Sequence, residues 1–292
     1  MKRELGTEES KAFATGLLHG VEIVADYMAI CYPAISEAEG SPETGYKTGC
    51  MKRLWLRAYV WMNTLRRLTD PLDFQAIAVG SRALFEILVD LILLHHDKTH
   101  ELAAKMFWWG ESEKLRASEQ IISFYDNQSL NVPDEFEAQV LFCKTEKVKI
   151  ENMRQTHWPN RKDPKRHPKR WTGNRYLSED VEQADKIYSS VLTSEIRTTL
   201  TEFYRTQYPK MNWQIHSSVL GLDQPSEGFY LTVGSSFKRC ADLAMLCTRI
   251  VLSDFDLDIT LQKTGNDWNR IRHKQDSAFA AALYNFHSNR NP

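Results

Sequence analysis

Apolar side chains recur at intervals of three and four along most of this 292-residue chain, the spacing typical of amphipathic α-helices. The helices that the pattern predicts span about 8–31, 47–69, 71–97, 99–126, 133–155, 178–192, 193–221, 235–254 and 267–287. Residues 228–233 show the alternation of a β-strand, and we expect one short strand there. The sequence therefore predicts an all-α bundle of roughly nine helices.

Prolines and capping residues set the expected helix boundaries. Pro33 is expected to end the first helix, because proline lacks the N–H that a helix interior uses. Thr193 or Ser194 is expected to cap the helix that follows, and Pro209 to kink it. The helix at 71–97 is apolar nearly all round, as is typical of a helix at the centre of a bundle.

Composition narrows the class of protein. Hydrophobic residues make up 42% of the chain and no stretch resembles a linker, so we predict a single domain over 1–292. The N-terminus lacks the apolar run of a signal peptide, and no uncharged apolar stretch reaches the length of a membrane span. Five cysteines without a C-x-x-C pair do not suggest a disulfide framework. We therefore expect a cytoplasmic protein that has no membrane contact.

One segment carries a strong local charge. Residues 154–176 hold eight Lys and Arg against one Asp, whereas the net charge of the whole chain is −1. Three prolines exclude a continuous helix and define a basic loop at 156–177. Cations interleaved with aromatic rings suit single-stranded nucleic acid, and a solvated surface loop is the alternative. The predicted nucleic-acid-binding residues are Arg161, Lys162, Lys165, Arg166, Lys169, Arg170 and Trp171.

Charged residues form a ladder in the otherwise apolar helix at 71–97. Arg82, Glu86 and Asp90 follow one another in steps of four, which places them on one side of the helix. One interpretation is an i,i+4 salt bridge on a narrow solvated face. The other is a buried charged network that lines a functional site.

A second ladder contains Tyr204, Tyr208, Asn212 and His216, again in steps of four. If the helix continues past Pro209, these side chains share one broad face. They could form a structural hydrogen-bond network. Alternatively, His216 acts as a general base or contacts a ligand, since histidine titrates near neutral pH.

Motifs of the common catalytic and cofactor sites are missing from the sequence. It contains no G-x-G-x-x-G, P-loop, H-E-x-x-H or G-x-S-x-G. His96 and His100 have a spacing that can bind a metal, but such a pair is more often found on a surface. We predict neither a cofactor nor a metal site.

Two segments resemble a bacterial family described as domain of unknown function 5677. One hallmark is the R-A-L-F-E stretch at 82–86, followed by an apolar helix. The other is a tryptophan-containing loop, here with Trp158 and Trp171, followed by a Tyr-x-x-x-Ser-x-x-x-His helix, here at 208–216. The resemblance covers about 50–222 and implies that the two ladders face each other across one cleft.

The chain departs from the second hallmark, because Asn212 stands where the family usually has serine. It also resembles, more distantly, the HEPN (higher eukaryotes and prokaryotes nucleotide-binding) ribonucleases, in which an Arg and a His on one helix cleave RNA. Here His216 is preceded by Asn212 rather than Arg, so the cation would come from Arg82 or from the basic loop.

These features lead to two functional hypotheses. The first is an RNA-directed, metal-independent ribonuclease that serves as a toxin or antiphage defence effector. Its predicted catalytic residues are Arg82, Glu86, Tyr208, Asn212 and His216. The alternative is a non-enzymatic module that senses a small ligand or binds a protein. The composition leaves room for a homodimer without locating its interface.

Overall fold

The computed structural model describes residues 8–40, 45–68, 74–159, 168–174, 176–195, 199–209, 211 and 226–257, with a few positions between 270 and 284. Its helices are α1 (Glu8–Glu37), α2 (Gly45–Leu65), α3 (Phe74–His96), α4 (Glu101–Asn127), α5 (Glu137–His157), α6 (Leu177–Glu195), α7 (Leu200–Thr206) and α9 (Ser226–Asp254). A 3-10 turn at Asp134–Phe136 precedes α5. No strand occurs among these residues, and the predicted all-α class is confirmed.

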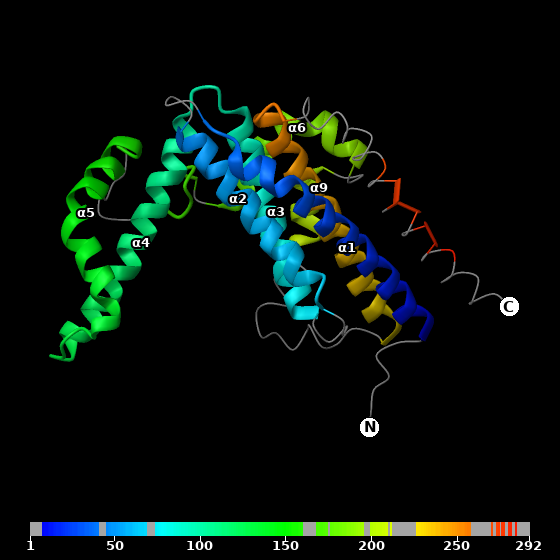
Figure 1. Ribbon diagram of the computed structural model, residues 1–292, viewed down its shortest axis with the longest axis horizontal. Coiled ribbons are helices and arrows are strands. Elements are labelled where there is room, and N and C mark those ends of the chain that lie inside the picture. The colour runs from blue at the N-terminus through cyan, green and yellow to red at the C-terminus, as the bar shows by residue number, and fades with distance from the viewer. Residues whose placement is uncertain are drawn as a thin grey trace.

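Helix α3 lies at the centre of the body, as its all-round apolar pattern predicts. The segment from Leu84 to Leu94 is buried except for Glu86 and Asp90. Helix α9 packs along α3 and along α1, and Figure 1 shows α1 and α9 side by side. The body therefore buries α3 behind an outer layer of helices.

Helices α3 and α9 run parallel and in a constant register. Ser81 lies beside Cys240, and His95 bonds to Asp254 at 2.9 Å. In each pair the two residues are 159 positions apart in the sequence. The two pairs lie about four helical turns from each other along the helices. Gly234 permits a close approach on the other side of α9, because a Cβ atom there would lie 3.0 Å from Leu17 Cδ1 of α1.

Two predictions are wrong: the end of the first helix and the short strand. Helix α1 continues through Pro33 to Glu37, since Cys31 and Ile35 are buried against the core and offset the lost backbone hydrogen bond. The expected strand at 228–233 is the beginning of α9. Val233 is fully buried there, so tertiary packing overrides the strand-like alternation.

The predicted cap between α6 and α7 is also wrong. Thr193 and Ser194 continue α6, and α7 begins only at Leu200. Thr199 is the cap, with its Oγ1 accepting from the Glu202 amide at 3.0 Å. A long-range partner completes the cap, because the Asp185 carboxylate of α6 accepts from the Leu200 amide at 2.9 Å.

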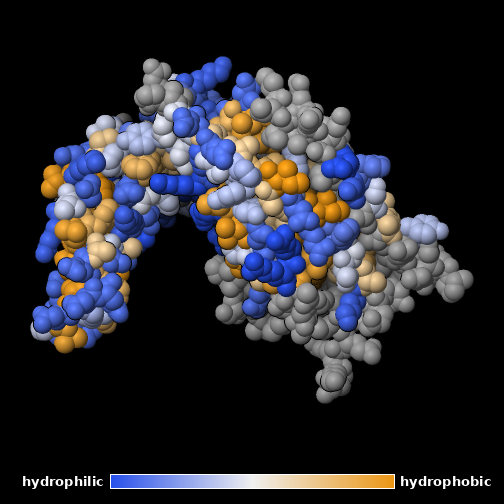
Figure 2. Space-filling view, in the orientation of Figure 1, coloured by the Kyte–Doolittle hydropathy of each residue, from blue (hydrophilic) through white to orange (hydrophobic). Residues whose placement is uncertain are grey.

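Helices α4 and α5 form an arm that projects from the body. They pack on each other, and Figures 1 and 2 show them standing away from the remaining helices with a wide hollow between. A small separate core holds the pair together, made of Trp108, Leu115 and Ile150. Among the described contacts, those of α5 fall on α4 and on the 3-10 turn.

One described helix meets the length and composition of a membrane span, namely Lys11–Glu37 within α1. Half of its most apolar window is buried inside the protein, chiefly against α9 and α2. Core helices of soluble proteins meet the same criteria, so this finding is weak evidence about the membrane.

Candidate functional site

Arg82 and Glu86, the first two residues of the charged ladder, form a cluster with Tyr208, which is 122 positions from Glu86 in the sequence. Arg82 Nε donates to Glu86 Oε1 at 2.8 Å, and the Tyr208 hydroxyl donates to the same oxygen at 2.5 Å. The Arg82 guanidinium also lies over the Tyr208 ring, 5.2 Å from its centroid. The side chains of Arg82 and Glu86 are 32% and 31% exposed, so the cluster borders solvent.

Aromatic rings fix this cluster against the body. Phe85 of α3 stacks on Phe203 of α7 at 4.6 Å between centroids, and it also contacts Tyr208 at 5.9 Å. Tyr204 packs on Tyr208 at 5.0 Å. Burial and the hydrogen bond to the Glu86 carboxylate raise the pKa of Tyr208 well above its usual value. Tyr208 is therefore a hydrogen-bond donor and not a base.

A second arginine reaches the same aromatic cluster from α9. The Arg239 guanidinium lies 5.6 Å from the centroid of Phe203. Among the described residues it forms no ion pair, and its burial lowers its pKa. Two guanidinium groups, Arg82 and Arg239, thus flank one patch of aromatic rings.

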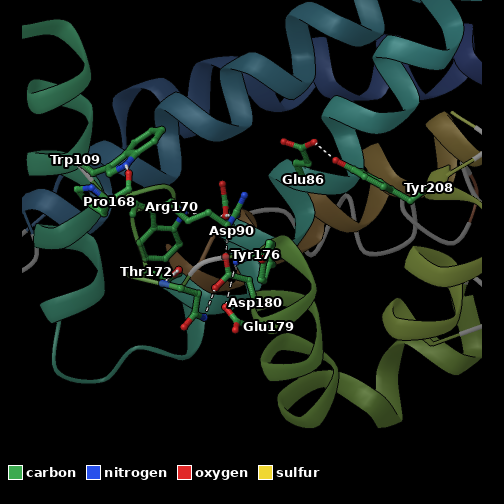
Figure 3. A network of polar contacts seen from close by, with 12 residues as sticks. Glu86, Asp90, Trp109, Pro168, Arg170, Thr172, Tyr176, Glu179, Asp180 and Tyr208 are labelled. Atoms are coloured by element: carbon green, nitrogen blue, oxygen red, sulfur yellow. Dashed lines mark hydrogen bonds and ion pairs between the residues drawn. The ribbon is translucent and has the colours of Figure 1, made fainter. Parts of the chain in front are cut away.

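Asp90, the last residue of the ladder, belongs to a different network (Figure 3). Arg170 Nη2 donates to Asp90 Oδ1 at 3.1 Å, and the Trp171 indole N–H donates to the same oxygen at 2.9 Å. Arg170 also pairs through Nε with Asp180, whose other oxygen accepts from Asn174 at 2.6 Å. One arginine is shared by two carboxylates, so the network joins α3, α6 and the end of the basic loop.

Burial dominates the protonation of Asp90. It raises the pKa of this carboxyl to about 7, because desolvation outweighs the opposing effects of Arg170 and the Trp171 N–H. The neighbouring carboxylates Asp180 and Glu86 raise it further. Near neutral pH, Asp90 is consequently divided between its charged and neutral forms.

The structure corrects the predicted role of two basic-loop residues. Trp171 is 3% exposed, so neither face of its ring is open to a base. The charge of Arg170 is compensated inside the protein by Asp90 and Asp180. Trp109 of α4 holds the start of this described segment by donating to the Pro168 carbonyl at 3.0 Å. The internal contacts of Arg170 and Trp171 remove both residues from the predicted nucleic-acid surface.

Lys169 has the opposite placement. Its side chain is exposed, and its ammonium lies 5.9 Å from the centroid of the Tyr176 ring. The remaining predicted nucleic-acid-binding residues lie outside the described part of the chain, as do two predicted catalytic residues: Arg161, Lys162, Lys165, Arg166, Asn212 and His216. The structure describes the second ladder as far as Tyr208, which contacts the first ladder at Glu86.

A third polar centre, which the sequence analysis missed, joins three helices. Asp254 of α9 pairs with Lys47 of α2 at 2.7 Å and with His95 Nδ1 of α3 at 2.9 Å. Hydrogen bonds to both partners hold the pKa of Asp254 below its usual value despite burial. No group of three or more metal-ligating side chains with suitable geometry occurs in the described residues.

The sequence analysis also missed Asp180 and Arg239. Asp180 lies in the first turn of α6, where an acidic residue is common because it favours the helix dipole. Arg239 is one of several charged residues in α9, and the tertiary packing decides which face of this helix is buried. Neither position carries a local sequence signal that distinguishes it from a surface residue.

Together, the fold and these clusters define an all-α protein with three polar networks along one central helix and a projecting helical arm. No family model, no curated protein and no solved structure matches the chain. The resemblance described from the sequence thus depends on the quoted residues, and the function is argued from the geometry.

Proposed function

We propose that the protein acts on RNA, as a ribonuclease-like effector centred on the Arg82–Glu86–Tyr208 cluster. The supporting observation is the hydrogen bond from Tyr208 to Glu86, because it attaches the start of the segment that carries Asn212 and His216 beside the Arg82 guanidinium. The cluster borders solvent, where a phosphate could reach it.

The proposed chemistry divides the work among these residues. His216 removes the proton from a ribose 2′-hydroxyl, whose oxygen attacks the adjacent phosphorus and displaces the 5′-oxygen, which takes a proton from water. Arg82 and Arg239 stabilise the negative charge that develops on the phosphate, and Glu86 orients Arg82. Asn212 would hydrogen-bond to the substrate. Such a reaction uses no metal and leaves a cyclic phosphate.

The strand itself would be held by exposed cations of the basic loop. Lys169 is the exposed cation of this set that the structure describes. Neutralised phosphates release counterions, so binding should weaken steeply with salt. In the cell, an activity of this kind suits a toxin or an antiphage defence effector.

The direct test is cleavage of total cellular RNA by the purified protein, with and without EDTA. His216→Ala should abolish cleavage and Arg82→Ala should reduce it by about a hundredfold or more, the usual effect of losing a positioned charge. His19→Ala is the matched control, since His19 is an exposed histidine of α1. Intact RNA with folded wild-type protein, verified by circular dichroism, would refute the proposal.

A second candidate function is a non-enzymatic module that senses a small anionic ligand. The observation in its favour is that Arg170 and Trp171 are used internally, which reduces the surface available to a nucleic-acid strand. This hypothesis predicts no cleavage but a rise in melting temperature with a small phosphorylated ligand, lost in Arg82→Ala and retained in His19→Ala.

A further inference from the structure

The outer part of the α4–α5 arm lacks a core of its own. From Glu119 to Lys149 the described chain contains no buried residue. The small core of the arm, made of Trp108, Leu115 and Ile150, lies nearer the body. Phe142 and Cys143 of this segment are only partly buried where they pack on that core, so the hairpin has little to offset the entropy of ordering its residues. The outer arm therefore requires further burial.

Large apolar side chains are exposed on this segment. Leu141 and Val148, seven residues apart on one face of α5, are 60% and 71% exposed. Phe124 and Leu130 near the tip are 56% and 53% exposed. Figure 2 shows hydrophobic residues along the arm, which stands free of the body in that view. The shared face of Leu141 and Val148 is the part of this exposure that points to a protein-binding surface.

Charge along the arm indicates what covers this surface. The arm tip, residues 119–143, carries five acidic side chains and no Lys or Arg. The arm base, residues 101–118 and 144–157, carries two more basic than acidic side chains. Four of the five tip acids make no ion pair within the described residues: Asp126, Asp134, Glu135 and Glu137.

A second copy of the arm complements both properties. If two arms lie antiparallel about a two-fold axis, each acidic tip faces the basic base of the other copy. The exposed apolar stripes then face each other, and two hairpins become a four-helix bundle. We propose that the protein dimerises through its arm, with Leu141 and Val148 at the centre of the interface.

The test is sedimentation of the full chain over about 1–100 μM, a range that resolves the dissociation constants expected of such an interface. The wild type should be dimeric. Leu141→Glu with Val148→Glu should raise the dissociation constant at least about a hundredfold, since both residues would be central contacts. The matched control is Ile30→Glu with Val60→Glu, which changes equally exposed apolar residues on the body; it should remain dimeric.

A charge variant tests the orientation without altering apolar contacts. Glu135→Lys with Glu137→Lys should weaken the dimer, and adding Lys144→Glu to the same chain should restore part of the affinity, because tip and base then attract again. A wild-type protein that is monomeric throughout the concentration range would overturn the proposal. A dimer that the body variant disrupts and the arm variants leave intact would overturn it equally.

Discussion

Glu86 and Asp90 lie one helical turn apart on α3 and occupy different environments. Glu86 forms the i,i+4 salt bridge that the spacing predicts, at the edge of solvent. Asp90 is enclosed by Arg170 and Trp171. The salt-bridge interpretation of the charged ladder thus describes Arg82 and Glu86, whereas Asp90 belongs to a buried charged network. The side chain alone does not decide which environment it has, because the difference arises from partners 80 or more positions away.

The hydroxyl of Tyr208 can be removed without altering its ring. Tyr208→Phe deletes the bond to Glu86 while Arg82 keeps the carboxylate paired, so we expect the free energy of unfolding to fall by about 1–2 kcal/mol. Urea denaturation measures the change. Tyr32→Phe is the control, because that ring is partly exposed and packs on Trp55. Equal losses in the two variants would contradict the assigned role of Tyr208.

Asp90 gives the protein a specific pH dependence. Its pKa is about 7 in the folded protein, above the ordinary value of 3.8, so between these pH values the folded state binds more protons than the unfolded chain. The stability contributed by neutral Asp90 is present at low pH and is lost as the pH rises through 7.

This dependence can be isolated with Asp90→Asn, which stays neutral at every pH. The free energy of unfolding of the wild type, relative to this variant, should fall by about 2–3 kcal/mol between pH 5 and pH 8. Guanidinium denaturation at several pH values measures the difference. Asp26→Asn, at an exposed position of α1, is the control for the substitution itself. A relative stability for Asp90 that rises over the same range would contradict the assignment.

At the scale of elements, ionic contacts decide how the end of the basic loop and the helices dock. Arg170 is the cation between Asp90 and the fully buried Asp180, whereas the adjacent Lys169 is exposed. Two neighbouring residues of one basic loop therefore have different roles, one internal and one directed to solvent.

Alanine at each position separates these roles. Arg170→Ala leaves Asp180 buried without its cation, so we expect a loss of about 3–5 kcal/mol in the free energy of unfolding. Lys169→Ala should change it by less than about 0.5 kcal/mol. Thermal and urea unfolding compare the two. If both variants lower the free energy of unfolding by the same small amount, Arg170 does not hold the loop in place.

Asp254 joins α2, α3 and α9 at one end of the body. Its side chain is 9% exposed and contacts both Lys47 and His95. Asp254→Ala leaves the Lys47 ammonium half-buried without a counterion, and we expect a loss of about 3 kcal/mol. Asp26→Ala, which breaks a pair at the surface, should cost less than about 1 kcal/mol. Denaturation curves for the two variants test this contrast.

At the scale of the whole molecule, stability is unevenly distributed between body and arm. The body buries many side chains of α3 between Ile77 and Leu94 and of α9 between Val233 and Leu252, while the outer arm buries no residue from 119 to 149. Local unfolding is expected where few side chains are buried. The arm should therefore open more readily than the body, unless a second copy covers it.

Amide hydrogen exchange measures this difference. In Leu141→Glu with Val148→Glu, peptides from 119–149 should exchange much faster than peptides from α3, by about two orders of magnitude or more. In the wild type, protection of the same peptides should increase with protein concentration. Concentration-independent protection of the outer arm would count against coverage by a second copy.

The sequence by itself determined the all-α class, the approximate positions of most helices and the central place of α3. These properties follow from short-range periodicity, and neighbouring residues carry that information. The i,i+4 pair of Arg82 and Glu86 follows from the same geometry. Each of these predictions needs only residues within a few positions of one another.

Tertiary structure alone decided the rest. Because of burial, α1 continues through Pro33 and residues 228–233 are helical. Long-range packing places Tyr208 beside Glu86 and Arg170 beside Asp90. It also turned Trp171 inward from a loop whose composition suits a nucleic acid. The physical reason is the same throughout: the free energy of a charged or aromatic side chain depends on what encloses it, and distant segments provide that enclosure.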